Sequence, residues 1–130
     1  MKYLLGHPHN SGMDPTQLDL IGTQVSDVGL AYFKDCKNLT VLNLHSTQVS
    51  DAGLAHFKDC KYLKYLHLNG TQVTDLSPLK GMPLKELRCD FKPERDAEIL
   101  RSIKTLETIN DKPAKEFWKE VDEKKLEKKP

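Results

Sequence analysis

The sequence predicts an α/β solenoid, in which short parallel strands stack on one side of the chain and short helices on the other. Residues 16–39 and 40–63 are two consecutive copies of one 24-residue unit, and a shorter third copy begins at residue 64. Each copy opens on a Leu-x-Leu segment and continues with apolar residues at helical spacing. Self-similarity at such a period is typical of stacked repeats that share one core.

Leucines that alternate with other residues identify the strands, because alternate side chains of a strand point to opposite faces. The first three strands are predicted at 18–20, 42–44 and 66–68, with the leucines inward. Leu87 and Cys89 continue the pattern, and Thr108-Ile109 forms a degenerate fifth strand. One further leucine stands three residues before the inward residue that opens each following strand: Leu39, Leu63, Leu84 and Leu106.

A Thr-Gln-Val triplet follows each of the first three strands, at 23–25, 47–49 and 71–73. We expect the valine to return to the core. The threonine falls in a tight turn, where its hydroxyl can satisfy backbone groups that have no partner in a neighbouring strand.

Short helices are predicted next. Ser26, Ser50 and Thr74 are good N-cap residues, and each is followed by an aspartate in the favourable first turn. The helices are about two turns long, and two apolar pairs at i, i+3 spacing face the strands. These pairs are Leu30 with Phe33 and Leu54 with Phe57.

The third and fourth copies depart from this plan. Residues 76–81 contain Pro78 and a following glycine, which predicts a single tight turn in place of a helix. The fourth copy lacks Thr-Gln-Val and predicts a longer helix from about Glu94. Its buried stripe is Ala97, Leu100 and Ile103.

A capping helix is predicted at residues 111–123, with Asp111 as its cap and Lys112-Pro113 at its start. Its apolar face, Phe117, Trp118 and Val121, is expected to cover the last coil, because a solenoid needs an atypical end. Residues 124–130 form a charged tail that we expect to fray.

Residues 1–14 do not match the repeat, and Pro15 stands where later copies have leucine. They form either an irregular N-terminal segment or the boundary of a fragment that lacks upstream repeats, and the absence of a helix pattern there favours the second. In that case the first strand is an open edge, through which two chains could pair.

The pattern L-x-x-L-x-L, the Asp-x-Gly-Leu segments at Asp27 and Asp51, and the 91–113 ending together resemble bacterial leucine-rich-repeat proteins of the Thr-Asp-x-Gly-Leu type. The resemblance implies four repeats and a degenerate strand over residues 15–110, with a concave sheet face that binds proteins. Some proteins with such repeats carry a Ser/Thr kinase domain, but kinase motifs are absent from this sequence. The cysteine-containing repeats of F-box substrate receptors are also similar, and no F-box is present.

Composition excludes several functions. The net charge is +1, which indicates neither a nucleic-acid partner nor an anionic membrane. No apolar run is long enough to span a bilayer, and the N-terminus does not have the apolar length of a signal peptide, so we expect a cytoplasmic protein. The three cysteines, Cys36, Cys60 and Cys89, are predicted as small buried residues in a reducing compartment; a Cys36–Cys60 disulfide is the alternative.

The outward residues of successive strands should form three rows on the sheet face. Their mixture of an aromatic ring, two imidazoles and both signs of charge suits protein recognition. The plain alternative is that they keep the sheet soluble. The candidate partner-binding residues are Asp19, Asn43, His45, Tyr65, His67, Asn69, Arg88 and Asp90.

The sequence predicts no catalytic residue, no metal site and no cofactor. His45 and His67 fall on neighbouring strands near Asp19 or Asp90, but their spacing matches no known ligand set, and a closed zinc site needs four ligands. The repeated Ser, Thr and Asp recur with the turn, as structural residues do. Two main hypotheses remain, neither with enzymatic activity: a non-catalytic protein-binding module, or a structural or regulatory segment of a larger protein, such as one with a kinase domain, whose main contacts are intramolecular. An enzyme with a His/Asp site on the sheet is a third, more distant alternative.

Overall fold

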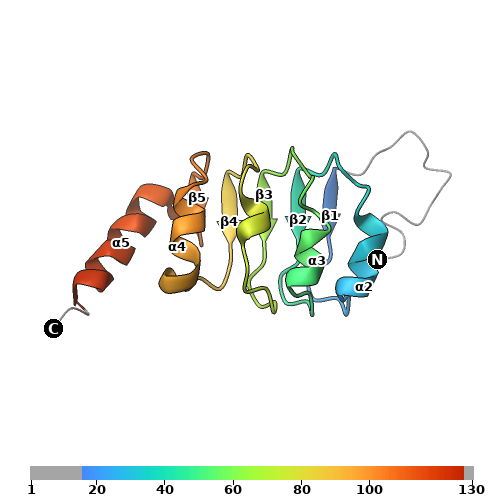
Figure 1. The fold of residues 1–130 in the computed structure, drawn as a ribbon, viewed down its shortest axis with the longest axis horizontal. Helices are drawn as coiled ribbons and strands as arrows, with labels where there is room; N and C mark the ends of the chain where they lie inside the picture. The colour runs from blue at the N-terminus through green and yellow to red at the C-terminus, as the bar shows by residue number, and fades with distance from the viewer. Residues whose placement is uncertain (1–15, 128–130) are drawn as a thin grey trace.

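The computed structural model describes residues 16–127. It is a solenoid in which the strands lie side by side and the helices cover one face of the sheet (Figure 1). The predicted α/β fold is therefore confirmed. The expectations for residues 1–14, and for what lies beside the first strand, fall outside the described residues.

The sheet contains the five predicted strands and a sixth that the sequence did not indicate. Neighbours in the sheet are also neighbours in sequence, and β1 to β5 are parallel. The last strand is antiparallel to the fifth. The strands are β1 (Gln17–Asp19), β2 (Val41–Asn43), β3 (Tyr65–His67), β4 (Glu86–Arg88), β5 (Thr108–Ile109) and β6 (Lys112–Pro113).

The core lies between the sheet and the helices, and it is built from the residues that the repeat predicts to face inward. Leucines of the strands, the valines of the first two turns and the helix residues Leu30, Phe33, Leu54 and Phe57 are all buried. Each fully buried leucine contributes about 2 kcal/mol through the apolar area that it removes from water. The single core therefore runs continuously through the coils.

The helices shorten and then lengthen along the chain. The third coil has only a single 3-10 turn, as its proline and glycine predict. The last helix of the repeats is the longest, and it begins at Pro93 with Leu100 and Ile103 facing the core. The helices are α2 (Asp27–Leu30) with the 3-10 helix η2 (Ala31–Phe33), α3 (Asp51–Ala55), the 3-10 helix η3 (Ser77–Leu79), and α4 (Pro93–Arg101).

The turn threonines bond as predicted. The hydroxyl groups of Thr23, Thr47 and Thr71 each donate a hydrogen bond to the carbonyl oxygen three residues earlier, at 2.6–2.8 Å. They satisfy backbone groups of their own coil, at the point where the chain leaves the strand.

The capping prediction for Ser26, Ser50 and Thr74 was wrong in its mechanism. Ser26 and Ser50 do precede helices, but neither hydroxyl caps its own helix, and Thr74 precedes η3 by several residues. Instead, Ser50 and Thr74 bond to the aspartate of the preceding coil. In an isolated helix, the Ser or Thr of such a pair would cap the helix. Here it connects two neighbouring coils through the aspartate of the preceding coil.

The fourth coil buries a charge that the repeat pattern does not predict. Asp96 is fully buried and lies beside Ala97, the partly buried residue that was predicted as part of the stripe. Its carboxylate accepts hydrogen bonds from the Arg95 guanidinium at 2.7 and 2.9 Å and from the Lys92 backbone N–H at 2.9 Å. The carboxylate thereby satisfies the Lys92 backbone N–H directly before α4.

The C-terminal end also differs in detail. Asn110 and Asp111 have φ angles of 51° and 69° and form the two-residue turn of a β5–β6 hairpin, so Asp111 is not a helix cap. Lys112-Pro113 is a strand, and α5 (Ala114–Glu127) starts after it and extends beyond the predicted end at residue 123 into the charged tail.

The apolar face of α5 packs as predicted. Phe117 is buried, and Trp118 and Val121 are partly buried against the core. Phe91, Phe117 and Trp118 meet edge to face, and Arg101 stacks over the Trp118 ring at 4.1 Å. These contacts close the last coil.

The three cysteines form no disulfide in the described part of the chain, where Cys60 and Cys89 are buried and Cys36 is partly exposed. Over the same residues, no helix has both the length and the apolar character that crossing a bilayer requires.

Candidate functional site

The face of the sheet opposite the helices carries the candidate residues, and we call it the open sheet face. The strand register aligns its first two rows as the repeat alignment predicts. The third row lies just beyond the strand ends. The rows are Gln17, Val41, Tyr65 and Glu86; Asp19, Asn43, His67 and Arg88; and Ile21, His45, Asn69 and Asp90.

Three of the candidate residues hold the turns beside the face. Asp19 and Asn43 each accept a hydrogen bond from the backbone N–H two residues later, at 3.1 and 3.0 Å. The carboxylate of Asp90 accepts the N–H of Gly70 in the preceding coil at 2.8 Å. These polar side chains therefore use part of their bonding capacity within the protein, and they fix the outline of the face.

The imidazole of His45 is also held within the protein. Its Nδ1 lies 2.9 Å from the carbonyl oxygen of Asn69, one coil further on. This contact joins two members of the third row and orients the ring.

The ring of His67 has a different partner. Its Nε2 lies 2.8 Å from the Glu86 carboxylate on the neighbouring strand. His45 and His67 therefore do not converge on one point, and the pairing that would begin a metal or acid–base site is not formed. Among the described residues, no three His, Cys, Asp or Glu side chains lie close enough to hold a metal ion.

Arg88 forms an ion pair with Asp111 at 2.7 Å, between β4 and the turn that follows β5. Both side chains stay substantially exposed, so the pair adds little to stability and remains available to a partner. Glu86 belongs to the first predicted row but not to the candidate partner-binding residues, and Asp111 is predicted only as a helix cap. The alignment in rows is the signal that could have found Glu86, whereas Asp111 enters only through the hairpin.

Two apolar or aromatic side chains stand out from this polar surface. Tyr65 is 40% exposed in the middle of the first row, and Ile21 is 50% exposed at the end of the third. Tyrosine and arginine, both present on this face, are residues that often anchor protein interfaces.

Within the described residues, two buried polar side-chain atoms lack a hydrogen-bond partner, and both belong to this face. They are Oδ1 of Asn69 and Nε of Arg88, an acceptor and a donor on adjacent coils. An unsatisfied buried polar group costs about 1–3 kcal/mol. Both atoms lie on the face that carries the candidate residues.

Comparison with known protein families agrees with the repeat. The family model described as Leucine Rich repeats (2 copies) matches residues 37–81. Among solved structures, the chain is similar to the crystal structure of an internalin from Listeria monocytogenes, with 21% sequence identity and a TM-score of 0.45. That match covers 72% of this chain and 34% of the internalin chain, so this chain spans about a third of the internalin's length. No curated protein matches the sequence.

Proposed function

We propose that this leucine-rich-repeat solenoid is a non-catalytic module that binds a protein partner on its open sheet face. The candidate contact residues are those of the three rows, with Tyr65 and Arg88 as the expected anchor residues. A repeat fold presents such a surface on a rigid stack, so a partner meets side chains that are already in place.

One observation carries the proposal: the polar atoms without a partner coincide with the exposed anchor residues. Oδ1 of Asn69 and Nε of Arg88 lack hydrogen bonds, and Tyr65 on the neighbouring strand is exposed. A peptide group offers both a donor and an acceptor, and it could pair with these two atoms after small side-chain rotations. Most buried polar atoms of a protein have a hydrogen-bond partner, so two such atoms on one face support a contact surface there.

The internal bonds of the face support the same function. His45 is held by Asn69, and Asp90 holds the N–H of Gly70, so the rows are connected from coil to coil. Side chains that are fixed before binding lose little conformational entropy when a partner arrives. This arrangement favours binding of a defined partner.

Site-specific crosslinking tests the proposal. Tyr65 is replaced by benzoylphenylalanine, and the photoactivated chain is exposed to extract from its native cell. Tyr32, which is 85% exposed on the helical side in η2, receives the same label as the matched control. We expect the label at position 65 to crosslink to one discrete protein. The label at position 32 should not crosslink to that protein.

The crosslinked protein is then purified and titrated against variants. Tyr65→Ala and Arg88→Ala should each weaken its affinity by about tenfold or more, as anchor residues do. Both side chains are partly exposed, so the variants should keep the melting temperature of the parent chain. Unchanged affinity in both variants would show that the partner binds elsewhere.

A further inference from the structure

The near-neutral net charge conceals a separation of charge between the two edges of the sheet. The segments that lead into β2 to β5 contain nine basic and three acidic residues, a net charge of +6. The segments that leave β1 to β4 contain five acidic residues and one basic residue, a net charge of −4. We call these the strand-start edge (34–40, 58–64, 80–85 and 101–107) and the strand-end edge (20–27, 44–51, 68–76 and 89–94).

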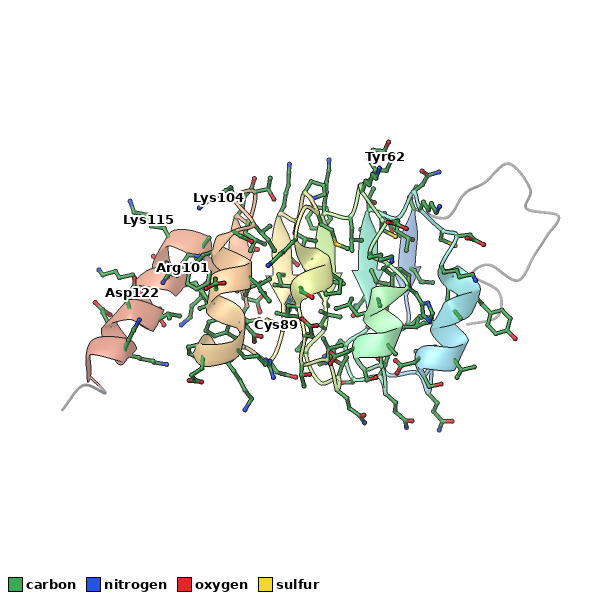
Figure 2. The ribbon with its side chains drawn as sticks, in the orientation of Figure 1. Tyr62, Cys89, Arg101, Lys104, Lys115 and Asp122 are labelled. Carbon is green, nitrogen blue, oxygen red and sulfur yellow. The ribbon has the colours of Figure 1, made fainter. Side chains whose placement is uncertain are left out.

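The topology is the cause of this separation. All strands from β1 to β5 run in the same direction, so the loops that precede them lie along one edge of the sheet. Backbone hydrogen bonds stack these loops, with Lys64 donating to Thr40 at 2.9 Å and Lys85 donating to Lys64 at 2.8 Å. Tyr62 and Lys104 accordingly project from the same side of the molecule (Figure 2).

The lysines of the strand-start edge are not neutralised within the described part of the chain. None of them lies within 4.0 Å of a described carboxylate, whereas Arg101 is occupied by Asp122 and Trp118. Figure 2 shows Arg101 and Asp122 close together at the α4–α5 junction. The lysines are Lys34, Lys37, Lys58, Lys61, Lys64, Lys80, Lys85 and Lys104.

A hollow of about 270 Å³ lies in this edge between the first two coils. Lys37 and Asn38 line it from one coil, and Asp59, Lys61 and Tyr62 line it from the next. Its volume is below the roughly 300–1,000 Å³ of small-molecule pockets, and it suits a single inserted side chain. Tyr62 is 60% exposed beside it, and the first coil has Asn38 at the same repeat position.

We propose that the strand-start edge is a second interaction surface, which binds an acidic polypeptide segment. A glutamate or aspartate of that segment pairs with Lys37 and Lys61, which line the hollow, and a lysine or backbone N–H of the same segment meets Asp59. The Tyr62 ring packs against the neighbouring part of the segment. The remaining lysines attract the segment electrostatically and raise its rate of association. This surface is separate from the open sheet face.

The charge pattern favours a protein over other polyanions. Asp35 and Asp59 are exposed among the lysines of the first two coils, and a phosphate backbone offers them no positive group. An acidic polypeptide can place a lysine or a backbone N–H there. A second copy of this chain fits less well, because Asp27 and Asp51 of its strand-end edge already accept hydrogen bonds from neighbouring coils.

The test uses the full chain and a fluorescent glutamate-rich peptide of about 12 residues that carries two lysines, at low and at physiological ionic strength. The test variant is Lys37→Glu with Lys61→Glu. Its matched control is Lys124→Glu with Lys125→Glu on α5, which changes the net charge equally at exposed positions. We expect the parent and the control to bind the peptide alike and the test variant to bind at least about tenfold more weakly.

Other anionic partners are measured in parallel. The probes are a single-stranded RNA of equal charge, phosphatidylserine-containing vesicles, and the chain itself by sedimentation. Tighter binding of any of these than of the peptide, or an equal loss in both charge variants, overturns the proposal, as does failure of the peptide to bind at low salt. None of these outcomes bears on the proposal for the open sheet face. The partner of that face should bind the Lys37→Glu, Lys61→Glu variant normally.

Discussion

The carboxylate of Asp27 holds Ser50, which lies 23 residues later and one coil further along the solenoid. One oxygen accepts the Ser50 backbone N–H at 2.7 Å, and the other accepts its hydroxyl. Asp51 binds Thr74 in the same way, at 2.7 Å from both donors. We call each aspartate with its hydroxyl partner a rung, and the rungs tie together coils that otherwise meet through the sheet and the apolar core.

Removing a rung should destabilise the protein in a pH-dependent way. Burial raises the pKa of Asp51, but hydrogen bonds from the Asp75 N–H and from Thr74 outweigh that effect and hold the pKa below its usual 3.8. A carboxyl whose pKa is lowered by folding stabilises the native state above its unfolded-state pKa, and this contribution is lost as the pH falls through the folded-state pKa.

Asp51→Asn should therefore cost about 1.5–3 kcal/mol near pH 7 and less at pH 2, because the parent carboxyl takes up a proton as the pH falls through its lowered pKa. Urea unfolding at both pH values measures the difference. The exposed Asp35→Asn is the control and should change little. An Asp51→Asn penalty that is the same at both pH values contradicts the assignment.

Gly53 is required by the closeness of the coils. A methyl group added there would overlap Oδ1 of Asp27, and it would also lie 2.9 Å from Val49 and 3.0 Å from Leu30. At Gly29, the same repeat position one coil earlier, the added group meets only Val25, at 3.0 Å. We expect Gly53→Ala to lower the free energy of unfolding by about 1–3 kcal/mol, because it overpacks the contact between α2 and α3.

Gly29→Ala is the comparison for that variant and should be close to neutral, since alanine favours helix and the Val25 side chain can shift. Thermal unfolding of the two single variants measures the difference, as a lower melting temperature for Gly53→Ala than for Gly29→Ala. Equal melting temperatures would contradict the close approach of the first two coils.

Asp96 should be the most sensitive charged residue of the fourth coil. Removing its buried carboxylate leaves the Lys92 N–H without its acceptor and the Arg95 guanidinium with only the Asp90 carbonyl oxygen, so Asp96→Ala should cost about 3 kcal/mol or more. Asp96→Asn keeps one acceptor and should cost less. Hydrogen exchange of the Lys92 amide reports the loss locally, and an unchanged exchange rate in Asp96→Ala would contradict the bond.

Thiol reactivity should separate the three cysteines. Burial raises the pKa of Cys60 to about 11 and that of Cys89 to about 12, so neither forms much thiolate near neutral pH. Cys36 is only partly buried. In the native protein we expect one fast reaction with a disulfide reagent, abolished by Cys36→Ser, and three equivalents after unfolding; rapid labelling of all three in the folded chain would contradict the buried positions.

The leucines, valines and helix phenylalanines could be placed from the sequence, because a strict repeat fixes which residues face the core and which strands are in register. The rungs could not, because a Ser-Asp pair before a helix has the local signature of an N-cap. Only the stacking of the coils brings Asp27 close to Ser50, whose hydroxyl then donates to Asp27 and does not cap its own helix. The burial of Asp96 was likewise hidden, since charged residues are rarely buried without a partner.

The same distinction applies to the open sheet face. Period-2 alternation was enough to predict its rows, and hence Tyr65, His67 and Arg88. The partners that orient them come from elsewhere, because Asp111 reaches Arg88 only through a turn with two positive φ angles. The charged edges could not be recognised from the net charge, because that number sums over the chain and does not say at which edge of the sheet each charge lies.

The rungs also mean that a 24-residue unit can be duplicated together with the groups that bond it to its neighbours. Each unit carries one aspartate for the coil that follows it and one hydroxyl for the coil that precedes it, so a duplicated unit brings both halves of a new rung with it. An in-frame duplication of residues 40–63 would lengthen the stack by one coil without leaving a donor or acceptor unmatched at either junction. Growth by whole units therefore requires no compensating substitution, whereas the shortened third coil, whose Asp75 turns back to the Ser77 N–H of its own coil, ends the series.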